Sequence, residues 1–153
     1  MAHYMHYHSY TDVMKRIQNH PRSSFDKITT DLGMPEKFEN GDTIWGCTAK
    51  KIGSEVCWYV LGRLDVTWHG LVIDVPDYVT SEFLFKEKKY TCCCPTSSAG
   101  KYRMAEVDEF RYAYLPDWGG GKFVGDLANN ERGGPLKLIA DDFVQKQLVE
   151  IEF

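Results

Sequence analysis

The alternation of apolar and polar positions is most regular over residues 41–79, where it predicts a β-hairpin that runs into a further strand. Residues 44–52 and 55–64 are strand-like runs, rich in β-branched and aromatic side chains. They are separated by Gly53 and Ser54, and a two-residue loop led by glycine is typical of a type II′ hairpin turn. Such a turn determines which residues of the two strands pair.

The predicted register gives the hairpin one apolar face. Its cross-strand pairs are Ile52 with Glu55, Ala49 with Trp58, Cys47 with Val60 and Trp45 with Gly62. These pairs indicate a Trp-rich core face, and we expect the opposite face to be mostly polar. The alternation continues to His69, and Gly62 and Gly70 mark positions where so long a strand would bend or bulge.

Two short helices are predicted before the hairpin. Thr11 is suited to cap a helix that ends at Asn19. Ser24 is suited to cap a second helix that ends at Gly33. The apolar residues at helical spacing in this second segment are Phe25, Ile28 and Leu32.

The second half of the chain reads mainly as strands. Strand-like patterns cover residues 81–91, the end of the segment 102–115, and residues 136–140. Asp141 or Asp142 is then suited to cap a short helix.

These elements predict an α+β fold in which residues 1–153 form a single globular domain. We expect a mainly antiparallel, curled or barrel-like sheet with two short N-terminal helices and a small C-terminal helix. The chain is 43% apolar and 26% charged, which is ordinary for a globular protein.

Charge argues against nucleic acid and membrane as partners. The net charge of -4 and the isoelectric point near 5.7 give no general attraction to polyanions. Two helices followed by a hairpin resemble, in outline, a winged-helix DNA reader. However, the basic residues of those helices are nearly cancelled by acidic neighbours. The two sets are Arg16, Arg22 and Lys27 against Asp12, Asp26 and Asp31.

Five cysteines, three of them consecutive at Cys92–Cys94, do not resemble a disulfide framework. We expect a reducing compartment, with the cysteines serving as small core residues. No apolar run is long enough to span a bilayer, so the predicted location is cytoplasmic.

His6 and His8 are the candidate metal ligands. On a strand they share one face, and two imidazoles at this spacing suit zinc or copper. No third ligand is identifiable, so the alternative is that residues 1–10 pack as an edge strand or fray in solvent. We predict no cofactor, with zinc or copper as the exception that this pair would allow.

The loop at residues 116–123 has the composition of a ligand-binding segment. Its glycines would let the backbone approach a ligand closely, its lysine would meet an anion, and its tryptophan would stack on a ring. The spacing is not that of a phosphate-binding loop. The predicted ligand-binding residues are Trp118, Gly119, Gly120, Gly121 and Lys122.

A catalytic alternative rests on His69, Asp65 and Arg63. All three fall on the predicted polar face of the central strand. Asp65 and His69 would lie about 13 Å apart on an extended strand, too far for contact unless the strand folds back near Gly70. A cluster of acids offers further general bases or hard-metal ligands, although such a cluster is more often a solvated turn. These acids are Glu106, Asp108 and Glu109.

Two functions are therefore predicted as alternatives. The preferred one is a non-catalytic binding or inhibitor protein that uses aromatic and Gly-rich loops to hold a small nucleotide-like ligand or a protein partner. The alternative is a small His-based or metal-dependent hydrolase that acts on phosphodiesters. A homo-oligomer is compatible with both. The high aromatic content, 14%, favours the first but is equally expected of a core.

Overall fold

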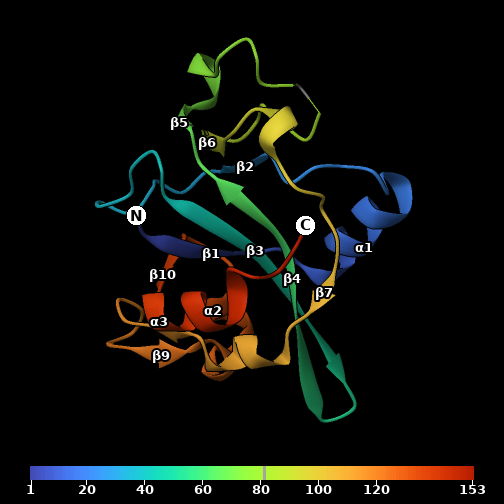
Figure 1. Ribbon diagram of the computed structural model, residues 1–153, viewed down its shortest axis with the longest axis vertical. Coiled ribbons are helices and arrows are strands. Elements are labelled where there is room, and N and C mark those ends of the chain that lie inside the picture. Colours follow the sequence, from blue (N-terminus) through green and yellow to red (C-terminus); the bar gives the residue numbers. More distant parts are fainter. Residues whose placement is uncertain (81) are drawn as a thin grey trace.

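Three β-sheets and a few short helices make up the protein, which we describe from a computed structural model of residues 1–80 and 82–153 (Figure 1). The largest sheet has five strands in the order β10-β1-β3-β4-β7. Its strands are β1 (His3–Tyr7), β3 (Thr43–Ile52), β4 (Glu55–Asp65), β7 (Ala105–Glu106) and β10 (Lys137–Ile139). Only the β1–β3 pair of this sheet is parallel.

The two smaller sheets are antiparallel. One has the order β2-β6-β5, and the other pairs β8 with β9. Their strands are β2 (Lys27–Thr30), β5 (Trp68–Leu71), β6 (Tyr90–Cys93), β8 (Tyr114–Leu115) and β9 (Lys122–Phe123). The predicted α+β class with mainly antiparallel strands is confirmed, but the described strands form three separate sheets rather than a closed barrel.

Helices are short. They are α1 (Tyr10–Asn19), α2 (Asn129–Arg132) and α3 (Asp141–Phe143), which continues into a π-helical turn at Val144–Leu148. Single 3₁₀ turns occur at Val72–Asp74, Thr96–Ser98, Asp108–Tyr112 and Val124–Asp126. Among the described residues, no helix is both long enough and apolar enough to cross a membrane.

The hairpin forms as predicted from its turn up to a β-bulge. Ile52 pairs with Glu55 and Cys47 pairs with Val60, but the register then shifts by one residue. Trp45 therefore pairs with Arg63 rather than with Gly62. The shift falls at the glycine expected to mark a bend, because an extra residue in β4 leaves two residues opposite one in β3.

Both faces of the five-stranded sheet are buried over most of β3, which corrects the prediction of a polar face. One core contains Trp45 and Trp58, and the other contains Ile44, Leu61 and Phe25. Within β3, only Lys50–Ile52 are exposed, and this end of the hairpin projects beyond the sheet in Figure 1. A polar side chain such as a threonine is compatible with either environment, so alternation alone did not identify the second core.

The first strand lies inside the sheet rather than at its edge. β1 pairs with β10 on one side and with β3 on the other. Its side chains alternate between the two cores, since Tyr4 belongs to one core and Met5 to the other. The interpretation as an edge strand or a frayed end is wrong, because β1 is hydrogen-bonded along both edges.

The predicted second helix is a strand. β2 pairs with β6, and the four consecutive residues Phe25, Asp26, Lys27 and Ile28 are all buried, which a helix with one exposed face would not allow. The apolar spacing of this segment fits a helix and a buried strand equally well. Asp26 and Lys27 are buried because they form an ion pair with each other at 2.9 Å.

Other predictions differ in detail from the structure. The first helix ends at Asn19 as expected, but Ser9, rather than Thr11, caps it. Of the predicted strand over residues 81–91, only the end belongs to β6; residues 82–89 form turns, and residue 81 lies outside the described residues. The aromatic alternation before β8 belongs largely to a 3₁₀ turn.

The short helix after β10 is confirmed, but it begins at Asp141 after Ala140, so neither Asp141 nor Asp142 caps it.

Candidate functional site

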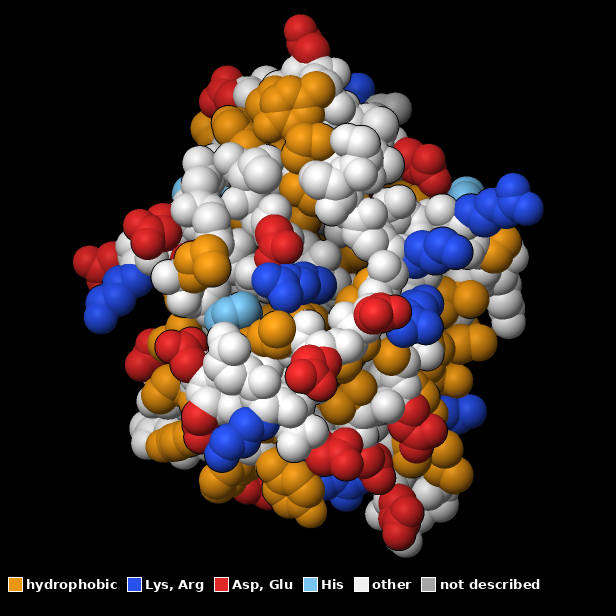
Figure 2. Space-filling view, viewed as in Figure 1, with side chains coloured by type: hydrophobic (Ala, Val, Ile, Leu, Met, Phe, Trp, Pro, Cys, Tyr) orange, Lys and Arg blue, Asp and Glu red, His pale blue; other side chains and the backbone are white. Residues whose placement is uncertain are grey.

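A cavity of about 550 Å³, here called the histidine cavity, lies between β1, α1, β2 and residues 83–88. It is the cavity in which the most chemically capable side chains meet. The residues that line it include His6, His8, Arg16, Lys27, Phe83 and Tyr102. On the face of the molecule shown in Figure 2, apolar side chains are interspersed with charged side chains of both signs.

Two glycines of the large sheet make room for an aromatic ring on which the cavity residues pack. Gly46 and Gly62 are cross-strand partners at the bulge, and a Cβ on Gly62 would lie 2.7 Å from Cβ of Phe25. The absence of both side chains makes room for the Phe25 ring, which is fully buried. His8 and Tyr102 then pack against that ring, with centroids 6.1 and 6.0 Å away. The bulge therefore positions one histidine and one tyrosine of the cavity.

His6 and His8 are in direct contact. His6 lies on β1 and His8 follows directly after that strand, on the side of the sheet where Phe25 packs. Nδ1 of His6 lies 2.9 Å from Nε2 of His8. The two rings are edge to face, with centroids 4.6 Å apart. Burial lowers the pKa of His6 to about 4 and the pKa of His8 well below its usual value. The pair is therefore two neutral imidazoles joined by a hydrogen bond.

Arg16 is clamped between two aromatic rings. Its guanidinium carbon lies 3.9 Å from the centroid of Phe83 and 3.8 Å from that of Tyr102. Nε donates to Oγ of Ser23 and Nη2 donates to the carbonyl of Ser24. Nη1 has no hydrogen-bond partner among the described residues.

Two other cations of the cavity have acidic partners, whereas Arg16 and the exposed Lys15 do not. Lys27 pairs with Asp26 at 2.9 Å and Lys88 pairs with Asp31 at 3.3 Å. Within the described part of the chain, no carboxylate lies within ion-pair distance of Arg16. Burial lowers the pKa of Arg16 from its usual value, which marks a cation that is incompletely solvated.

This arrangement suits an anion better than a metal ion. The neighbouring cations repel a divalent metal, and among the described residues no third histidine, cysteine or carboxylate joins His6 and His8. The group of metal-capable side chains that the structure does bring together is Cys57, Glu106 and Asp108. The two carboxylates are solvent-exposed and Asp108 already pairs with Arg111, so this group is explained without a metal.

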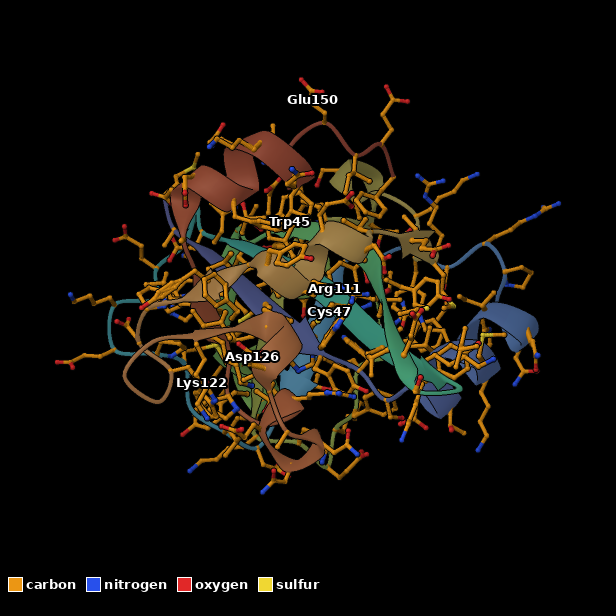
Figure 3. All side chains as sticks on the ribbon, turned by 90° about the horizontal axis from the view of Figure 1, so that it is seen from below. Trp45, Cys47, Arg111, Lys122, Asp126 and Glu150 are labelled. Carbon is orange, nitrogen blue, oxygen red and sulfur yellow. The ribbon has the colours of Figure 1, made fainter. Side chains whose placement is uncertain are left out.

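The predicted Gly-rich loop joins β8 to β9, and its polar groups have partners within the protein. Nζ of Lys122 and Nε1 of Trp118 both donate to Oε2 of Glu131. Lys122 is the first residue of β9, and Figure 3 shows it apart from Cys47 in the core. Gly119, Gly120 and Gly121 all have positive φ, so these glycines are required by the turn itself.

The candidate catalytic residues are not brought together. Arg63 and Asp65 form an ion pair at 2.9 Å at the end of β4. His69 lies on β5, in a different sheet, where its Nδ1 is 2.6 Å from Oδ1 of Asn40. The strand predicted to carry all three residues ends at Asp65, so Asp65 and His69 belong to different strands.

The cysteine run is part of the interior. Cys92, Cys93 and Cys94 are all buried, on and just after β6, and Cys47 is buried in the core on the opposite face. Burial raises the pKa of Cys93 to about 11, and it raises the pKa of Cys92 and Cys47 further. Thiols of this kind are poor nucleophiles, so the expected role as small core residues accounts for them.

Sequence reasoning did not identify Arg16, Phe83 and Tyr102 as members of one site. They come from three distant segments, and no local motif connects them. One local signal was present, because Arg16 lies three residues after the buried Val13 and therefore on the inward face of α1. An arginine on the inward face of an amphipathic helix needs a partner for its charge.

Comparisons with protein-family models, curated proteins and solved structures found no match to this chain. The evidence for a function therefore lies in the side chains of the histidine cavity.

Proposed function

We propose that this protein is a non-catalytic binding protein that holds a small nucleotide-like ligand in the histidine cavity. The observation that carries the proposal is Arg16, a cation fixed between two aromatic rings. Among the described residues, its Nη1 has no hydrogen-bond partner and no carboxylate lies within ion-pair distance. A buried or half-buried charge without a counterion is costly, and an anionic ligand would supply the missing partner. Phosphate groups are recognised by arginine in this way.

The cavity also has the size and the apolar surfaces for the remainder of such a ligand. A volume of about 550 Å³ lies within the range of roughly 300–1,000 Å³ that is typical of small-molecule sites. Phe83, Phe85 and Tyr102 line it, and aromatic side chains provide faces for a planar ring. A concave site of this volume favours a small molecule over a protein partner.

Binding is favoured over phosphodiester hydrolysis by the state of the two histidines. A general acid must be protonated near neutral pH, but burial lowers the pKa of His6 to about 4. An acid and a base must also lie on either side of a substrate, whereas these two rings contact each other directly at 2.9 Å.

Isothermal titration calorimetry with the four ribonucleoside 5′-monophosphates tests the proposal. We expect at least one of them to bind, and Arg16→Gln to weaken its binding about 10- to 100-fold, because a hydrogen bond to a charged group is lost. Lys146→Gln is the matched control, since it removes an exposed positive charge from a residue that does not line the cavity. Thermal unfolding of each variant verifies that it is folded.

Arg16→Lys separates charge from geometry. It keeps the positive charge but cannot stack flat between Phe83 and Tyr102, so we expect intermediate binding. Nucleotide binding that is unchanged in folded Arg16→Gln, or the absence of binding by all four nucleotides, would contradict the proposal.

A further inference from the structure

The histidine pair has a property that neither imidazole has alone. Nδ1 of His6 and Nε2 of His8 are occupied with each other, so each ring keeps one outer nitrogen, Nε2 of His6 and Nδ1 of His8. Neither outer nitrogen makes a hydrogen bond among the described residues. Neither is among the buried unpartnered atoms of those residues, which are Oγ1 of Thr48 and Nε of Arg132. Neither outer nitrogen is therefore sealed from solvent, and both histidines line the cavity.

The two neutral rings must have the same tautomer. If His6 donates from Nδ1, then His8 accepts at Nε2 and carries its proton on Nδ1. If His8 donates from Nε2, then His6 accepts at Nδ1 and carries its proton on Nε2. In either direction, one outer nitrogen is a donor and the other is an acceptor. Reversing the shared hydrogen bond exchanges these two roles.

We propose that this pair recognises the ring of the ligand by hydrogen bonds. The preferred ligand is a nucleobase-type heterocycle that carries at least one hydrogen-bond donor and one acceptor. The inference rests on the proposed function, because it concerns the same cavity. Arg16 would hold the anionic end, and the pair would select the uncharged end. A ring without these groups would leave the two outer nitrogens unpaired on binding, which weakens affinity.

The surroundings hold the pair in its uncharged state. Arg16 on α1 and Lys137 on β10 oppose protonation of the pair, and the rings of Phe25 and Tyr102 cover His8. Lys15, Lys27 and Lys88 also line the cavity, and Asp12 is the acid among the lining residues. The balance of charge around the pair is therefore positive, which favours neutral imidazoles.

The tautomers are measured first, on the free protein. Long-range ¹H–¹⁵N correlation spectra distinguish a proton on Nδ1 from a proton on Nε2. We expect His6 and His8 to be neutral at pH 7 and to have the same tautomer. Opposite tautomers, or a protonated ring at pH 7, would overturn the inference without bearing on Arg16.

Binding then tests recognition of the ring. Ribose 5-phosphate has the anion of a nucleotide but no base, so we expect the preferred nucleoside monophosphate to bind about 10- to 100-fold more tightly. His6→Phe and His8→Phe keep a ring of similar size but remove the nitrogens. In each variant the preference for the nucleotide should fall to within about twofold, while ribose 5-phosphate binds as before.

His69→Phe is the matched control, because His69 lies outside the cavity on β5. It should keep the full preference for the nucleotide. Equal binding of nucleotide and ribose 5-phosphate to the unmodified protein, or a preference that survives in folded His6→Phe and His8→Phe, would overturn the inference and leave the anion site standing. If none of these phosphates binds, the proposed function is overturned, and the recognition of the ring by the histidine pair is overturned as well.

Discussion

Single side chains determine the character of the histidine cavity. Arg16 is a cation whose guanidinium lies between the rings of Phe83 and Tyr102 rather than against an acid. His6 and His8 remain neutral because burial and neighbouring positive charge both disfavour protonation. A fixed cation next to a neutral donor–acceptor pair is a combination that distinguishes the two ends of a ligand.

The same histidines predict how stability depends on pH. The unfolded His6 has a pKa near 6.5 and the folded one a pKa of about 4, so between these values the unfolded chain binds more protons. Their contribution to the free energy of unfolding is complete above pH 6.5 and decreases as the pH falls towards 4. For half-buried rings we expect a loss of about 1–2 kcal/mol per histidine between pH 7 and pH 5.

Urea unfolding at pH 7 and pH 5 measures this loss. The double variant His6→Phe/His8→Phe should lose less stability than the unmodified protein over the same interval, since the carboxylates common to both proteins contribute equally. An identical loss in both proteins would show that the pair is not buried in its neutral form.

At the level of elements, the hairpin was predictable because its information is local. The Gly53-Ser54 turn determines the pairing from Ile52 to Cys47, and every one of those pairs is confirmed. The register beyond that point depends on Phe25, which comes from a different part of the chain and fills the space left by Gly46 and Gly62. A bulge could be anticipated at the glycine, but its direction could not.

Gly62→Ala tests whether the glycine pair is required by this packing. A Cβ at this position would lie 2.7 Å from Cβ of Phe25, which is closer than two carbon atoms can approach. We expect the free energy of unfolding to fall by about 1–3 kcal/mol, as measured by chemical denaturation. Gly33→Ala is the control, because a Cβ there meets no atom within 4 Å, and it should change stability by less than about 0.5 kcal/mol. Equal effects of the two substitutions would contradict the packing of Phe25 on Gly62.

Sequence patterns misassigned an element whose environment depends on residues distant in the chain. β2 was predicted as part of a helix because Phe25, Ile28 and Leu32 recur at helical spacing after a serine suited to cap a helix. In the structure, Lys27 is satisfied by Asp26, Thr80 and the carbonyl of Glu82, which allows it to be buried. Nothing within residues 24–33 reveals these later partners.

At the scale of the whole molecule, the fold class was predictable and the site was not. Hydrophobic periodicity indicates the proportion of strands and helices, and it correctly predicted mainly antiparallel strands with few helices. A site made of β1, α1 and the segments at Phe83 and Tyr102 exists only after the chain folds. His6 and His8 were found because strand alternation brings them together locally. Arg16 was not, since its aromatic partners are distant in sequence.

The central claim, that the histidine cavity and not the Gly-rich loop holds the ligand, is tested most directly by a ¹H–¹⁵N NMR titration with the tightest-binding nucleoside monophosphate. The account predicts that the largest backbone shift changes occur at His6, His8, Arg16, Phe83 and Tyr102, with small changes at residues 118–122. Changes centred on residues 118–122, with the cavity residues unaffected, would contradict it.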